Sequence, residues 1–171
     1  ATSGHAEIII AGSNGKAVRF NEETVRPLSR AAKGVKGFNV DGGEVIGLAT
    51  NEEGKYILTI TKNGFGKKSD LSDYRITSRG AKGVRTANLT DKTGELVAMR
   101  SINGDEDCMI MTDAGIIIRI SLKQVSVVGR NTIGVKFINI KDGEGVSNVA
   151  ILDPEDDSEE DQLEESLETN E

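Results

Sequence analysis

Basic residues recur in a fixed pattern around three Gly-Val pairs of this sequence. The three copies read RAAKGVKGFNV (30–40), RGAKGVRTANL (79–89) and RNTIGVKFINI (130–140). In each copy an arginine precedes the glycine by four residues, and another cation follows the glycine by two. These positions are held by Arg30, Arg79 and Arg130, by Gly34, Gly83 and Gly134, and by Lys36, Arg85 and Lys136. Regularly spaced cations have the chemistry needed to neutralise a run of phosphate groups.

Other cations accompany this pattern. Lys33 and Lys82 precede the first two glycines, whereas Ile133 holds the corresponding place in the third copy. Further candidates for phosphate contact lie on or near the strand expected earlier in each repeat: Lys16, Arg19, Lys67, Lys68, Arg119 and Lys123. We expect the valine after each motif glycine to face inward and the following cation to face outward, since side chains alternate along a strand. If about eight cations contacted phosphates, the logarithm of the DNA-binding constant would fall with the logarithm of the salt concentration with a slope of roughly −7.

The whole chain is organised as three repeats. Turn-like contexts surround Gly15, Gly64 and Gly115, which are 49 and 51 residues apart, and each motif arginine follows its turn glycine by 15 residues. Glu44, Glu95 and Glu144 recur at spacings of 51 and 49. Matching offsets of this kind indicate a repeat architecture with equivalent glycine turns.

Each repeat of roughly 50 residues has the pattern of four β-strands. Short aliphatic runs (6–12, 55–61 and 107–112) end at or before the turn glycine, and a second run follows it as the return strand of a hairpin. The motif strand and a closing apolar strand complete the unit, with single helical turns possible near 70–76 and 121–127. The sequence therefore predicts an all-β, propeller-like domain at 1–152, with repeats at about 6–54, 55–106 and 107–152.

The charge of the chain is unevenly distributed. Of its 28 acidic residues, eleven lie from Asp153 onward, where there is no basic residue, so 1–152 carries 17 acidic and 21 basic residues. We expect 153–171 to be a disordered acidic tail that competes with phosphate for the basic body. The basic body favours nucleic acid as the partner, and the scarcity of aromatics, 4% of residues, favours bent duplex over stacked single strands.

No catalytic, metal or cofactor site is expected in this chain. Cys108 is the single cysteine, and His5 has no ligand partner at a usable spacing. Neither Tyr56 nor Tyr74 follows an arginine, and GFGKKS (64–69) lacks the first glycine of a phosphate-binding loop. The sequence has no apolar run long enough for a membrane helix and no secretion signal, so a cytoplasmic location is predicted.

The segments LSRAAKGVKG, TSRGAKGVRT and VGRNTIGVKF, followed by VSNVAILD and an acidic end, resemble the C-terminal domain of the A-type protein of DNA gyrase. Two features depart from that family: Ile133, and the missing glutamine- and glycine-rich box of its first blade. The resemblance implies a β-pinwheel, in which neighbouring blades exchange strands, and this chain would provide the last three blades plus the tail.

The resemblance also implies a function. Double-stranded DNA would wrap around the basic rim, which lets a type II topoisomerase introduce negative supercoils in an ATP-dependent reaction. The partners would be the gyrase B protein and the rest of the gyrase A protein, in a heterotetramer of two A and two B subunits that binds ATP and Mg elsewhere. Two alternatives remain open: the similar domain of the A-type protein of topoisomerase IV, and a propeller-type scaffold whose rim binds an acidic protein.

Overall fold

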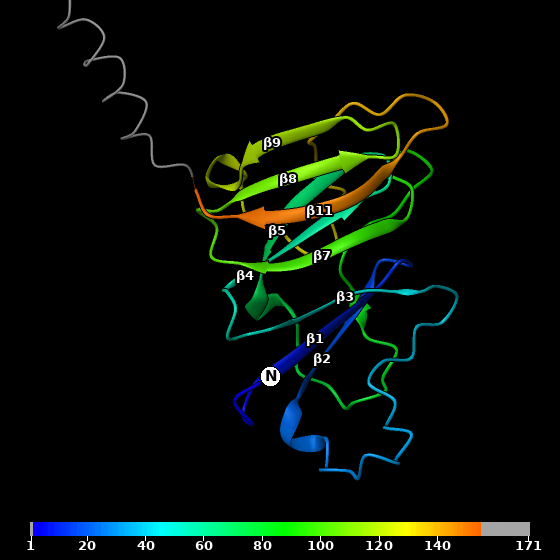
Figure 1. Cartoon of the computed structure of the whole chain (residues 1–171), viewed down its shortest axis with the longest axis vertical. Helices are drawn as coiled ribbons and strands as arrows, with labels where there is room; N and C mark the ends of the chain where they lie inside the picture. The colour runs from blue at the N-terminus through cyan, green and yellow to red at the C-terminus, as the bar shows by residue number, and fades with distance from the viewer. Residues whose placement is uncertain (1, 155–171) are drawn as a thin grey trace, which may run out of the picture.

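Three antiparallel sheets, one for each repeat, are stacked in the computed structural model, which describes residues 2–154 (Figure 1). The first sheet has the order β3 (Val45–Thr50), β1 (Glu7–Gly12), β2 (Lys16–Asn21), β6 (Val84–Arg85). The second has the order β10 (Val135–Lys136), β5 (Phe65–Asp70), β4 (Tyr56–Thr61), β7 (Leu96–Ile102). The third has the order β11 (Val146–Leu152), β8 (Asp107–Thr112), β9 (Ile117–Ser121). The predicted all-β architecture is confirmed.

Each sheet is built on a hairpin whose turn contains the repeated glycine. Gly15, Gly64 and Gly115 have φ angles of 76°, 81° and 81°, in the left-handed region that favours glycine. Their N–H groups donate to the carbonyls of Gly12, Thr61 and Thr112, respectively, at 3.0–3.1 Å. The three turns are therefore equivalent, as their common offset to the motif arginines predicts.

Strands are exchanged between neighbouring sheets, as the resemblance implies. The motif strand of the second repeat, β6, pairs with β2 of the first sheet. Likewise β10, from the third repeat, pairs with β5 of the second sheet. Both motif strands are only two residues long, and residues 34–40 of the first repeat form no strand. The expectation of four strands is thus met in the second and third repeats but not in the first, which contributes β1, β2 and β3, and because β10 joins the second sheet, the third sheet has three strands among residues 2–154.

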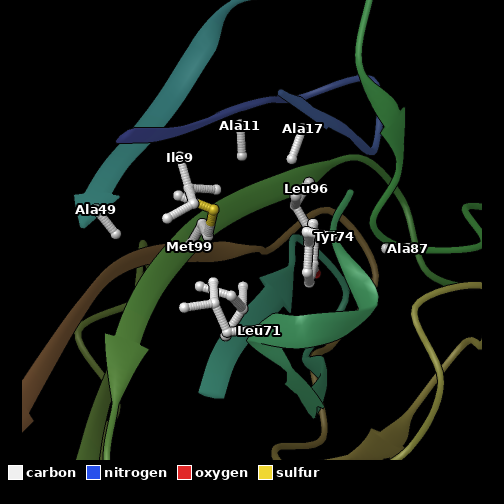
Figure 2. Packing of buried hydrophobic residues seen from close by; sticks show 10 residues of the cluster. Ile9, Ala11, Ala17, Ala49, Leu71, Tyr74, Ala87, Leu96 and Met99 are labelled. Atoms are coloured by element: carbon white, nitrogen blue, oxygen red, sulfur yellow. The ribbon is translucent and has the colours of Figure 1, made fainter. Parts of the chain in front are cut away.

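Apolar side chains fill the spaces between the sheets. Figure 2 shows Ala11 and Ala17 of the first sheet directed toward Leu96 and Tyr74 of the second repeat, with Ile9 beside Met99. A separate cluster of buried aliphatic residues joins the second and third sheets. Each sheet packs an apolar face against the neighbouring sheet. This packing holds the three motifs in a fixed order along the stack.

A single 3₁₀ turn follows the return strand of each hairpin, at η1 (Glu22–Thr24), η2 (Leu71–Asp73) and η3 (Leu122–Gln124). The last two lie where the sequence indicates short helical turns. Within residues 2–154, no helix is long and apolar enough to cross a membrane. The acidic segment from residue 155 onward lies outside the described residues, so its disorder stays a prediction.

Candidate nucleic-acid interface

The glycines of the second and third motifs fix these motifs against the preceding sheet. A Cβ atom on Gly83 would lie 2.3 Å from the Ala17 carbonyl oxygen, and one on Gly134 would lie 2.4 Å from that of Gly66. No larger residue fits so close to a backbone oxygen. The φ angles of these glycines, 69° and 88°, also favour glycine. The spacing of the motif therefore follows from docking of one repeat on the previous one.

Three cations that follow these glycines are exposed: Lys36, Arg85 and Lys136. We call them the outer row. Arg85 and Lys136 lie on the edge strands β6 and β10, and Lys36 lies at the equivalent position of the first motif. The expected outward direction of these cations is confirmed. The inward direction of the valines is wrong for Val135 and Val35, which are 58% and 39% exposed.

The motif arginines connect successive members of the outer row. A guanidinium N–H of Arg79 donates to the Lys36 carbonyl at 2.9 Å, and one of Arg130 donates to the Arg85 carbonyl at 2.7 Å. Arg30, the first of the series, is exposed. Arginine at this position therefore positions the preceding cation through its backbone, a role that the sequence pattern alone does not distinguish from phosphate contact.

A second bond in each junction runs in the opposite direction along the chain. The Asn39 N–H donates to the Ala81 carbonyl at 3.0 Å, and the Asn88 N–H donates to the Thr132 carbonyl at 3.1 Å. Together with the arginine bonds, these contacts make a ladder from motif to motif. The ladder fixes the distance between outer-row cations without using their side-chain charges.

The local surroundings of the outer-row cations differ. Lys16 is paired directly opposite Arg85 in the β2–β6 register, which brings two positive charges together. Like charges in such a pair repel each other, and a bound anion would relieve the repulsion. In the next sheet Phe65 holds the place of Lys16, and the Lys136 ammonium lies 5.6 Å from the centre of its ring.

An acidic residue lies beside this row. Asp41 accepts a bond of 3.0 Å from the Lys82 ammonium, and this bond holds the pKa of the Asp41 carboxyl below its usual value. The nearby charge of Lys16 acts in the same direction. Both partners of the ion pair are more than 60% exposed, so the pair would exchange readily with a phosphate.

The structure corrects the predicted positions of Lys67 and Lys68 on the outer rim. They are 2% and 5% exposed. The Lys67 ammonium donates to the carbonyls of Gly129 and Arg130, and that of Lys68 donates to the carbonyls of Leu122 and Gly104. Burial, followed by the charge of Arg130, lowers the pKa of Lys67 to about 8. Neither ammonium is placed to contact a large anion outside the sheet.

Arg19 and Arg119 also have protein partners. Arg19 donates to the Glu7 carboxylate and, at 2.8 Å, to the carbonyls of Leu71 and Tyr74 in the next repeat. The Arg119 Nε donates to Asp107 at 2.7 Å. Arg19, Lys68 and Arg119 hold the same position in successive sheets, and we call them the inner row.

The remaining predicted cations are accessible. Arg30, Lys33, Lys82 and Lys123 are exposed, and Lys16 is half-buried. Lys123 lies in η3, away from the motif segments in the sequence.

Two lysines outside the three motif copies, which the sequence analysis did not single out, lie beside the outer row. Lys92 lies 5.4 Å from the centre of the Phe65 ring, and Lys92, Lys136 and Lys141 line one hollow of about 340 Å³. Asp142 and Glu144 line the same hollow. Lys92 and Lys141 are 49 residues apart and each precedes a repeated glutamate, Glu95 or Glu144, by three residues, so the repeat could have identified them; Asp41 holds the equivalent place in the first repeat.

Comparisons with known proteins place the chain in a family. The family model described as DNA gyrase C-terminal domain, beta-propeller, matches residues 6–51, 55–103 and 106–153. The DNA gyrase A protein of Ureaplasma parvum serovar 3 is 45% identical over 152 residues, which are 88% of this chain and 18% of that protein. The gyrase A protein of Mycoplasma genitalium is 43% identical, over 95% of this chain and 20% of its own length. This chain thus spans about a fifth of these relatives.

Solved structures share the fold. A DNA gyrase A C-terminal domain matches with a TM-score of 0.77 at 22% identity, over 86% of this chain and 51% of its own. The C-terminal domain of a DNA topoisomerase IV matches with a TM-score of 0.83 at 23% identity, over 98% of this chain and 52% of its own. The family match extends through all three repeats, each of which contributes one motif to the ladder. The chain belongs to the DNA gyrase C-terminal domain family.

Proposed function

We propose that this chain binds duplex DNA without sequence preference and bends it along the outer row, as a C-terminal part of a gyrase A protein. The observation that carries the proposal is the line of exposed cations Lys36, Arg85 and Lys136, linked by the backbone ladder. Cations fixed at regular intervals release a counterion for every phosphate they neutralise. Because these contacts are to phosphates, they position the duplex without reading its bases.

The proposed mechanism uses a rigid surface. The second and third motifs are docked on the preceding sheet and bonded to the motif before them, so the backbone that carries the cations does not have to be ordered when DNA binds. Contacts on successive sheets favour a duplex that bends to reach all of them, and the cost of bending is offset by the additional phosphate contacts. Lys33 and Lys82, beside the first two motif glycines, would extend the positive surface.

Within the whole protein, we propose that this wrapping gives a type II topoisomerase its direction toward negative supercoiling. The gyrase B protein and the remainder of the gyrase A protein would be its partners in a heterotetramer of two A and two B subunits. ATP and Mg would be bound by those other parts, in the cytoplasm. This chain would set the path of the wrapped duplex, while other parts of the protein would cleave the DNA strands.

The test compares a triple variant of the outer row, Lys36, Arg85 and Lys136 each changed to Gln, with a matched control. The control changes three exposed cations outside the motifs, Arg26, Lys55 and Arg75, to Gln. The outer-row variant should bind unrelated duplexes more weakly, with a salt slope flattened by about 0.9 for each lost contact. It should also lose the linking-number change that the chain imposes on relaxed circular DNA closed by a topoisomerase.

Equal affinity and linking number for the two variants would contradict the proposal. The alternative scaffold function predicts something different: tight binding of an acidic polypeptide, with no preference for duplex at matched charge. A competition between duplex and polyglutamate for the chain therefore separates the two functions.

A further inference from the structure

The two junctions between neighbouring sheets have different side chains opposite their outer-row cation. At the first junction Arg85 lies opposite Lys16 in the β2–β6 register. At the second junction Lys136 lies opposite Phe65 in the β5–β10 register. The second junction therefore lacks the strand cation that accompanies Arg85 at the first.

A lysine from the turn before β7 supplies a second positive charge at the second junction. The Lys92 ammonium lies 5.4 Å from the centre of the Phe65 ring, and the Lys136 ammonium lies 5.6 Å from the same centre. Phe65 is only 7% exposed, so the core fixes its ring. Attraction between an ammonium group and the face of an aromatic ring holds both lysines beside it.

The residue of the first repeat that corresponds to Lys92 is Asp41. The carbonyl of each accepts a bond from the asparagine of the neighbouring hairpin turn. Asn14 donates to the Asp41 carbonyl at 2.8 Å, and Asn63 donates to the Lys92 carbonyl at 3.1 Å. The two side chains therefore start from equivalent backbone positions and differ only in the sign of their charge.

The motif residue beside this position changes together with it. At the first junction the Asp41 carboxylate forms an ion pair with Lys82 of the second motif, at 3.0 Å. In the third motif Ile133 holds the place of Lys82. A lysine at residue 133 would put a like charge beside Lys92, so the departure of this motif from the repeated pattern leaves the Lys92 ammonium unopposed.

These exchanges conserve the charge of a junction and move one cation from a strand to a turn. The Asp41–Lys82 pair is neutral, and each junction retains two further positive charges. They are those of Arg85 and Lys16 at the first junction, and of Lys136 and Lys92 at the second. Within residues 2–154 none of these four side chains forms an ion pair with a carboxylate.

The hollow of about 340 Å³ beside Phe65 is open to a ligand of opposite charge. Lys92, Lys136 and Lys141 line it, together with Asp142 and Glu144. In the part of the chain that the structure describes, neither carboxylate pairs with any of the three lysines. An anion entering the hollow thus meets ammonium groups that it does not have to take from a carboxylate.

We propose that Lys92 and Lys136, held by the Phe65 ring, clamp one phosphate of the wrapped duplex at the second junction. This inference rests on the proposed function and adds Lys92 as a binding residue and Phe65 as a positioning residue. Two ammonium groups beside one ring repel each other, and a phosphodiester between them relieves the repulsion. Because Lys92 belongs to the turn side of the second sheet, the duplex is drawn toward the hairpin turn there. Asp41 opposes the same displacement at the first junction.

The first experiment measures duplex binding of Lys92→Gln at several salt concentrations. Its matched control is Lys55→Gln, since Lys55 is exposed and its ammonium also lies over an aromatic ring, 5.2 Å from the centre of Tyr56. Lys55 lies beside η2, where its carbonyl accepts the Leu71 N–H, and not beside a motif. Lys92→Gln should flatten the salt slope by about 0.9, so its loss of affinity should grow about eightfold for each tenfold fall in salt. Lys55→Gln should bind as the wild type does.

The triple variant of the outer row is measured beside these two. If Lys92→Gln binds as Lys55→Gln does while the outer-row variant loses affinity, the clamp is wrong and the proposed function stands. If the outer-row variant also keeps its affinity, the proposed function is wrong and the clamp fails with it.

The second experiment tests the role of the ring. Phe65→Leu keeps an apolar side chain in the core but removes the aromatic face, and Phe65→Tyr keeps the face. Phe65→Leu should flatten the salt slope, and adding Lys92→Gln to it should have less than half of its effect in the wild type. Phe65→Tyr should retain the wild-type slope, which a purely structural role of Phe65 does not require. A full effect of Lys92→Gln in the Phe65→Leu background, or equal slopes for Phe65→Leu and the wild type, would overturn the proposal.

Discussion

The outer row and the inner row have the same spacing along the sequence and opposite surroundings. Lys36, Arg85 and Lys136 recur at 49 and 51 residues, and so do Arg19, Lys68 and Arg119. The side chains of the outer row are exposed, whereas those of the inner row are bonded to carbonyls and carboxylates. A shared period identifies equivalent positions in a repeat, but their partners decide whether a cation binds a ligand or stabilises the fold.

The partners of the inner row come largely from the following repeat. Arg19 reaches the carbonyls of Leu71 and Tyr74, and Lys68 reaches that of Leu122. These carbonyls lie in or next to the 3₁₀ turns η2 and η3, and those of Leu71 and Leu122 also accept the N–H groups of Tyr74 and Val125, so the inner-row cations add a second bond there. The inner row therefore ties one sheet to the next, whereas the outer-row side chains remain exposed.

Removing an inner-row cation should have the largest effect on stability. Arg19→Leu leaves the Glu7 carboxylate without its partner, in a pair whose side chains are 14% and 18% exposed, and removes the bonds to the carbonyls of Leu71 and Tyr74. We expect a loss of about 3 kcal/mol in the free energy of unfolding, measured with urea. Lys36→Leu in the outer row should change it by no more than about 0.5 kcal/mol. Similar losses in both variants would remove the distinction between the rows.

The ladder arginines should show an intermediate effect. Arg79→Gln and Arg130→Gln each remove a bond to the carbonyl of the preceding motif, which should cost about 1 kcal/mol of unfolding free energy. Arg30→Gln is the matched control, because Arg30 holds the same motif position and is exposed. The dependence of duplex affinity on salt concentration should change less in Arg79→Gln than in Arg85→Gln. If the arginine acts only as a phosphate ligand, stability stays constant and the slope falls in all three variants.

Much of the fold follows from local signals in the sequence. The glycine turns and hairpins are predictable because a left-handed turn requires glycine and aliphatic runs flank it. The surroundings of Lys67 and Lys68 are not, because Ile118 and Val18 hold the places equivalent to Lys67. The bonds that make burial of Lys67 possible come from residues 129 and 130, more than 60 positions away. The ladder is likewise hidden, since arginine suits both a phosphate and a carbonyl.

Lys67, the buried neighbour of the inner-row residue Lys68, gives the stability of the fold a pH dependence. Its pKa is about 8 in the folded chain against 10.5 for an ordinary lysine, chiefly because of burial. Between these values the unfolded chain binds more protons than the folded one, so this lysine makes stability increase as pH rises from about 8 to 10.5. The unfolding free energy of the wild type relative to Lys67→Met should therefore rise across that window. A constant difference would mean that Lys67 titrates normally.

The smallest expected effect concerns the like-charge pair of Lys16 and Arg85. Lys16 and Arg85 are directly opposite across β2 and β6, and like charges in such a pair destabilise a sheet by up to about 1 kcal/mol. Lys16→Gln should therefore stabilise the chain by about 0.5 kcal/mol at low salt, with the gain shrinking as salt is added. The same change should weaken duplex binding and flatten its salt slope by about 0.9, because one phosphate contact is lost. Lys55→Gln, an exposed change outside the motifs, should leave both quantities unchanged. If Lys16→Gln raises stability and lowers duplex affinity, the charge of Lys16 serves ligand binding at the expense of the fold. If Lys16→Gln lowers stability, Lys16 instead stabilises the fold, as the inner-row cations do.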